Sequence, residues 1–139
     1  MRQVQDQEKH VLFVEDSEDD RALYSHFLSR RGYRVSTAEN GREGVEKAFQ
    51  LHPDVILMDL WMPEVGGWAA TRSLKTDDRT KDIPVVIITG HPASFMDEET
   101  LGCEGFLSKP CLPEKLRAEI ERVLDHADGK TANPGPYRN

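Results

Sequence analysis

The sequence predicts a doubly wound α/β domain, in which helices cover both faces of a mostly parallel sheet. Short, continuous apolar runs, typical of strands that are buried on both faces, alternate with segments of helical periodicity. Four of these runs end in polar, chemically capable residues: 11–14, 55–58, 85–88 and 106–107. Because ligands bind at the carboxyl ends of the strands in such sheets, we expect these polar residues to gather at one edge.

The composition indicates one soluble domain with its own core. The chain has 139 residues, of which 31% are charged and 37% are apolar. We expect a polar lead-in over residues 1–8, a domain over 9–127 and a tail over 128–139. The net charge of −7 argues against nonspecific binding to nucleic acid, which requires basic surface.

The sequence shows no sign of export or membrane insertion. The first residues are polar and mixed in charge, so they form no signal-peptide core, and no apolar run approaches the roughly 20 residues that span a bilayer. Cys103 and Cys111 form no CxxC pair and have no histidine at ligand spacing. A reduced cytoplasmic protein without a structural disulfide or zinc site is expected.

The first half of the chain begins with a strand at 11–14 and a helix at 17–31. Ser17 can cap this helix and Gly32 ends it, with Leu23, Phe27 and Leu28 as the apolar stripe. A second, more polar strand at 33–38 suits a sheet edge. A helix at 42–51 and a strand at 55–58 follow. In that helix, the residues expected to face inward are Val45, Ala48 and Phe49.

The second half begins with a turn-rich loop at 60–67, a helix at 68–74 and a charged loop at 75–82. A strand at 84–89 precedes a weakly patterned helix between 92 and 101. A short strand at 105–108 and a strongly amphipathic helix at 113–126 complete the domain. The apolar face of this last helix comprises Leu116, Ile120, Val123 and Leu124.

Three acids are expected at the functional edge. Glu15 and Asp16 are adjacent at the end of a buried strand, where a divalent cation with oxygen ligands would relieve their repulsion. Asp59 closes the most hydrophobic run, and a carboxylate there could bind the same cation or attack phosphorus. The alternative for each acid is a structural one, as a loop residue or a helix cap.

A hydroxyl and an ammonium group join these acids. Thr89 could donate to a phosphoryl oxygen, with Gly90 allowing close approach of the backbone, although Thr is also simply common in strands. Burying Lys109 in the core would be unfavourable unless its ammonium group paired with the acids. The same ammonium could neutralise phosphoryl charge. Pro110 fixes the following turn, and the sequence leaves its peptide bond cis or trans.

Taken together, these residues resemble the receiver domain of two-component response regulators, in particular a stand-alone, chemotaxis-regulator-like receiver. The resemblance extends from about His10 to His126. It implies a flavodoxin-like (βα)5 three-layer sandwich with parallel strand order 2-1-3-4-5. The residues that carry it are Glu15, Asp16, Asp59, Met62, Pro63, Gly67, Thr89, Gly90, Phe106, Lys109 and Pro110.

The resemblance implies a role for each acid. Asp59 would be the phosphoacceptor, receiving a phosphoryl group from a phosphohistidine of a histidine kinase or histidine phosphotransfer protein. Asp16 and Asp59 would bind Mg²⁺, or Mn²⁺ in its place, directly. Glu15 would act through water, and Trp61 would contribute its backbone carbonyl. Such a protein catalyses only its own phosphorylation and dephosphorylation.

The resemblance also implies a switch. Lys109 would bind a phosphoryl oxygen, Thr89 would move toward the phosphoryl group, and Phe106 would turn inward. The surface of the fourth helix, fifth strand and fifth helix would then contact a downstream protein target, or a second copy in a homodimer. Neither a nucleic acid nor a membrane is expected as a partner.

Two residues should modulate the lifetime of the phosphoryl group. Trp61 and His91 each lie two residues after a site residue, where water access would be set. The bulk of Trp61 suggests slow autodephosphorylation, and an unchanged decay rate in a Trp61→Asn variant would rule this out. The alternative is that Trp61 points to solvent and lends only its carbonyl.

Other classes of protein fit less well. A haloacid-dehalogenase-like phosphatase also forms an aspartyl phosphate, but it requires a second acid at the position of Trp61. A flavodoxin-like nucleotide-binding protein would need a glycine-rich loop after the first strand. A receiver that is never phosphorylated, and a receiver fragment of a larger hybrid kinase or regulator, remain as further alternatives.

Overall fold

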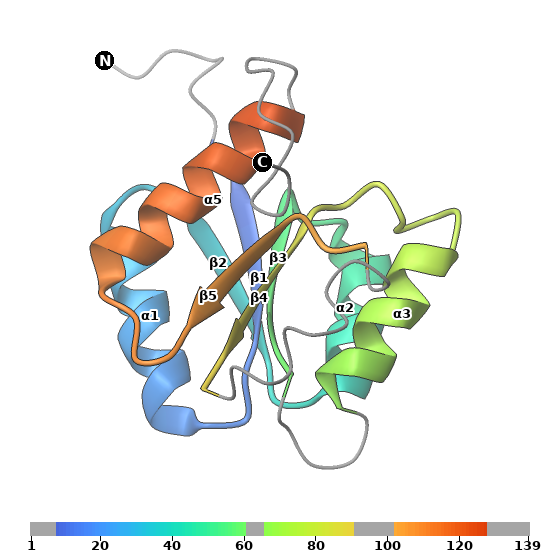
Figure 1. Ribbon diagram of the computed structural model, residues 1–139, viewed down its shortest axis with the longest axis horizontal. Helices are drawn as coiled ribbons and strands as arrows, with labels where there is room; N and C mark the ends of the chain where they lie inside the picture. The colour runs from blue at the N-terminus through green and yellow to red at the C-terminus, as the bar shows by residue number, and fades with distance from the viewer. Residues whose placement is uncertain (1–7, 61–65, 91–101, 128–139) are drawn as a thin grey trace.

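A five-stranded parallel sheet forms the centre of the computed structural model, which describes residues 8–60, 66–90 and 102–127 (Figure 1). The order is β2-β1-β3-β4-β5, and each neighbouring pair is parallel, as the sequence predicted. The strands are β1 (His10–Val14), β2 (Arg34–Ala38), β3 (Val55–Asp59), β4 (Val85–Thr89) and β5 (Gly105–Ser108).

Helices cover both faces of this sheet. α1 (Glu18–Arg30) and α5 (Pro113–Ala127) lie on one face, and α2 (Gly41–Leu51) and α3 (Gly67–Thr76) lie on the other (Figure 1). α3 is longer at both ends than the predicted helix at 68–74. The helix predicted between 92 and 101 lies outside the described residues, as do the expected tail and nearly all of the lead-in.

The three central strands, β1, β3 and β4, are buried on both faces, and their side chains alternate between two core layers. Val11 and Phe13 of β1 pack toward α1 and α5, whereas Leu12 and Val14 pack toward α2 and α3. The predicted apolar face of α5 is confirmed, because all four of its residues are buried in the first layer. β2 is more exposed and lies at one edge of the sheet, as expected from its polarity.

Two residues predicted to face the core do not. Leu23 of α1 is 57% exposed, and Tyr24 takes the buried position because its hydroxyl donates to the carbonyl oxygen of Cys111, 2.9 Å away. Phe49 of α2 is 37% exposed, and its ring lies 4.2 Å beneath the guanidinium of Arg79. In both cases a contact with a distant segment, which periodicity does not reveal, determines the burial.

Neither cysteine forms a disulfide, and both are buried. None of the helices in the described part of the chain combines the length and apolar character that crossing a bilayer requires.

Candidate functional site

Three carboxylates meet at the carboxyl ends of β1 and β3. Glu15 and Asp16 directly follow β1, and Asp59 is the last residue of β3. Val14 is paired with Met58 across the two strands, so the next residues along each strand are neighbours. One carboxylate oxygen from each of the three acids lies within 4.8 Å of the other two. The predicted gathering of acids is therefore confirmed.

Lys109 reaches this cluster from the end of β5. Its Nζ donates to Glu15 Oε1 at 2.6 Å, to Asp20 Oδ2 at 3.1 Å and, at 3.5 Å, to Asp59 Oδ2. Its backbone N–H donates to the carbonyl oxygen of Thr89, which extends the β4–β5 pairing to the site. The peptide bond between Lys109 and Pro110 is cis. The expected pairing of Lys109 with the acids is thus observed.

Glu15 is held at several points of its side chain and backbone. Its second carboxylate oxygen accepts a hydrogen bond from the backbone N–H of Ser17. Its own backbone N–H donates to Ala38, and its carbonyl oxygen accepts from the Arg21 guanidinium at 2.7 Å. The Glu15 side chain is 1% exposed, whereas Asp16 is exposed. The cluster therefore has a fixed, buried side and a side that is open to solvent.

Burial and mutual charge alter the protonation of the buried pair. Burial raises the pKa of Glu15 to about 7, the negative charge of Asp59 adds to this rise, and the hydrogen bond from Lys109 opposes it. Burial would by itself lower the pKa of Lys109. The hydrogen bond to Glu15 and the charge of Asp59 outweigh that effect and raise this pKa, so Lys109 keeps its positive charge.

Thr89 and Phe106 lie on the other side of the sheet from Lys109. Thr89 is fully buried at the end of β4. Phe106 is paired with Ile87, two residues before Thr89 on the same face, and packs against the core layer beneath α2 and α3. The alternation along β4 and β5 thus places these two residues on one face, next to each other along the strands, as a coupled movement would require.

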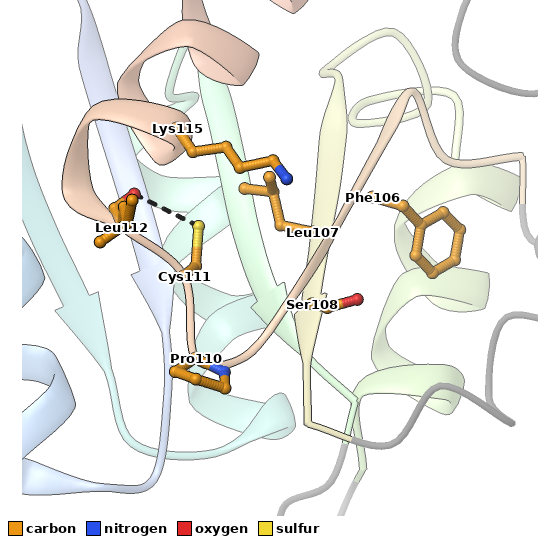
Figure 2. A pocket seen from close by; sticks show the side chains of 7 residues that line it. All are labelled: Phe106, Leu107, Ser108, Pro110, Cys111, Leu112 and Lys115. Atoms are coloured by element: carbon orange, nitrogen blue, oxygen red, sulfur yellow. Dashed lines mark hydrogen bonds between the residues drawn. The ribbon is translucent and has the colours of Figure 1, made fainter.

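A hollow lies beside β5 and the start of α5 (Figure 2). Figure 2 shows the ring of Phe106 pointing to the side of β5 opposite Leu107 and Lys115. Leu112, at the rim, is 74% exposed. The residues that line the hollow are Phe106, Leu107, Ser108, Pro110, Cys111, Leu112 and Lys115.

One member of the site escaped prediction from the sequence. Asp20 lies in the acidic first turn of α1, and no role in the site was predicted for it, yet among the described residues its carboxylate is the second-nearest partner of the Lys109 ammonium. The sequence feature that could have indicated this position is the helix cap. Ser17 accepts a hydrogen bond from the backbone N–H of Asp20, and an acid three residues after a capping residue points back toward the start of its helix. Trp61 and His91 lie outside the described residues.

The donor set fits a hard divalent cation. Glu15, Asp16 and Asp59 offer only carboxylate oxygens, which cations such as Mg²⁺ prefer, with neither sulfur nor imidazole in the cluster. The exposed Asp16 leaves room on the solvent side for the water ligands that Mg²⁺ usually retains.

Comparison with known families agrees with this geometry. The family model described as "Response regulator receiver domain" matches residues 11–121. The chain belongs to this family. The receiver domain is a signalling module rather than an enzyme acting on a separate substrate, and the family match thus favours it over the phosphatase and nucleotide-binding alternatives.

Individual receivers are similar over most of their length. The polar-differentiation response regulator DivK of Brucella anthropi is 40% identical over 122 residues, which cover 86% of this chain and 98% of that protein. The structure of chemotaxis protein CheY4 of Vibrio cholerae is 34% identical with a TM-score of 0.79, covering 84% of this chain and 98% of that one.

Receivers from larger proteins are similar as well. The signal receiver domain of a signal transduction histidine kinase from Syntrophus aciditrophicus is 29% identical with a TM-score of 0.78, and the match covers 94% of this chain and 97% of that one. The same architecture therefore occurs in different regulators. Membership of the receiver family implies a histidine kinase as partner.

Proposed function

We propose that Asp59 of this receiver domain accepts a phosphoryl group from a phosphohistidine of a histidine kinase or histidine phosphotransfer protein. The observation that carries the proposal is the position of Asp59 next to two further acids and within 3.5 Å of the Lys109 ammonium group. Phosphoryl transfer needs little besides positioning and charge neutralisation, and these groups supply both.

In the proposed step, an Asp59 carboxylate oxygen attacks phosphorus and forms an O–P bond. The N–P bond of the partner's phosphohistidine breaks, and its electron pair stays on the imidazole nitrogen. Lys109 donates to a phosphoryl oxygen and neutralises part of its charge. No proton needs to leave Asp59 for this reaction, because the ionised carboxylate is the nucleophile.

Glu15, Asp16 and Asp59 would hold a Mg²⁺ ion, or Mn²⁺ in its place, with Glu15 acting through water and the Trp61 carbonyl as a further ligand. When bound, the cation draws charge from the phosphoryl oxygens and brings them close to the acidic cluster. Asp16 is the acid best suited to bind the ion directly, because it is exposed and Lys109 makes its contacts with the other two.

The phosphoryl charge would then act on a protein-binding surface. Thr89 would move toward the phosphoryl group and Phe106 would follow it inward, changing the hollow beside β5 that Phe106 lines. This face, with the exposed Leu112 at its rim, would contact the downstream target or a second copy of the chain. Trp61 and His91 would set how long the modified state lasts.

Intact mass after incubation with Mg²⁺ and acetyl phosphate tests the proposal. We expect one added phosphoryl group on the unmodified protein, and none on Asp59→Asn or in the presence of a chelator, because the nucleophile or the cation is then missing. Asp19→Asn is the matched control, because it removes one exposed acid from the first turn of α1. A phosphoryl group retained on Asp59→Asn would contradict the assignment.

A further inference from the structure

Asp20 contacts Lys109 from outside the acidic cluster. It is the third residue of α1, and its backbone N–H donates to the Ser17 side chain that caps the helix. This position lies at the positive end of the helix dipole, which stabilises a carboxylate there. This favourable interaction with the helix dipole does not depend on the contact between Asp20 and Lys109.

The contacts of the ammonium group are uneven. Lys109 Nζ lies 2.6 Å from Glu15 and 3.1 Å from Asp20, but 3.5 Å from Asp59, the proposed phosphoacceptor. A lysine ammonium has three N–H donors, and three carboxylates already receive them. A phosphoryl oxygen can gain a hydrogen bond from Lys109 only if one of these partners gives way.

Burial indicates which partner yields. The Glu15 side chain is 1% exposed, so losing Lys109 would leave a desolvated acid beside Asp59. The Asp20 side chain is 35% exposed and can be solvated by water instead. Of the two shorter contacts of Lys109, the one with Asp20 is therefore the less costly to exchange for a phosphoryl oxygen.

We propose that Asp20 is a positioning residue that holds Lys109 away from Asp59 until a phosphoryl group displaces it. This inference rests on the proposed function, because it assigns Lys109 to the phosphoryl oxygen. Asp20 thereby sets the rate of phosphorylation without touching the reacting atoms.

The test compares Asp20→Asn with Asp19→Asn in the full chain. Both substitutions remove one negative charge from the first turn of α1, but only Asp20 contacts Lys109 among the contacts that the structure describes. We expect Asp20→Asn to raise the initial rate of phosphorylation by acetyl phosphate about two- to fivefold, the range for losing one partly exposed ion pair. Asp19→Asn should change it less.

A spectroscopic measurement separates this role from a merely structural one. In protein labelled with ¹⁵N-lysine, the Nζ resonance of Lys109 should shift in Asp20→Asn and stay in place in Asp19→Asn, both before phosphorylation. Suppose that the parent is phosphorylated, but Asp20→Asn reacts no faster than Asp19→Asn or shows no shift of the Lys109 Nζ resonance. Either result would overturn this inference and leave the proposed function intact. A parent that takes up no phosphoryl group would overturn the proposed function, and this inference with it.

Discussion

Replacing Gly67 with alanine is expected to lower the free energy of unfolding by about 2–3 kcal/mol, toward the upper end of the range for overpacking. A Cβ at this position would lie 2.2 Å from the carbonyl oxygen of Asp59 and 2.6 Å from Cα of Leu60. Both are backbone atoms and cannot rotate away, so α3 or the end of β3 must shift.

A shift of β3 would reach the functional site directly, because Asp59 is its last residue. Denaturant unfolding, read as a change in midpoint at constant slope, measures the loss of stability. Gly90→Ala is the control for stability, because among the described residues its Cβ would meet only the Lys109 Cβ, at an ordinary 3.8 Å. If both variants unfolded at the same denaturant concentration as the parent, the steric explanation would be wrong.

Glu15→Gln is expected to stabilise the metal-free protein above pH 7. The pKa of Glu15 is about 7 in the folded chain and is near its ordinary 4.5 in the unfolded chain, so the folded state binds the proton more tightly. The contribution of Glu15 protonation to the free energy of unfolding is fully present below pH 4.5 and is lost as the pH rises through about 7. Over this window the loss is on the order of 2–3 kcal/mol.

The difference in unfolding free energy between the parent and Glu15→Gln should therefore change by about 2–3 kcal/mol between pH 4.5 and 8. Taking the difference matters, because His10 opposes the trend: burial, together with the charge of Arg34, lowers its pKa, so its contribution is lost toward low pH. A difference that does not vary with pH would contradict the shifted pKa. Added Mg²⁺ should stabilise the parent most at high pH, where Glu15 is ionised, and the variant less.

The Glu15 prediction rests on a residue whose place in the site could be read from the sequence. A carboxylate that ends a buried apolar run must lie at the carboxyl edge of a parallel sheet, and this applies to Glu15 and Asp59 alike. The alternation of strands and helices likewise specified the doubly wound fold and the polar edge strand β2. These are consequences of local pattern combined with the few topologies that parallel sheets allow.

Contacts between distant segments could not be read in this way. Helical periodicity placed Leu23 in the core, but Tyr24 is buried instead, and its hydroxyl donates to the carbonyl oxygen of Cys111, 87 residues away. Consecutive residues point about 100° apart around a helix, so the rotation of α1 about its axis decides which of the two faces the core. The sequence pattern does not reveal how α1 is rotated about its axis, because the segments that pack against the helix decide this rotation.

The sequence by itself therefore determined the fold, the gathering of Glu15, Asp16, Asp59 and Lys109, and the family. Only the tertiary structure decided how the single ammonium group is shared among its carboxylates. That sharing depends on differences of less than 1 Å among Nζ–oxygen distances of 2.6, 3.1 and 3.5 Å, and on the exposure of each acid. Both depend on how α1 packs against β1, β2 and α5, which brings Asp20 to a lysine 89 residues away.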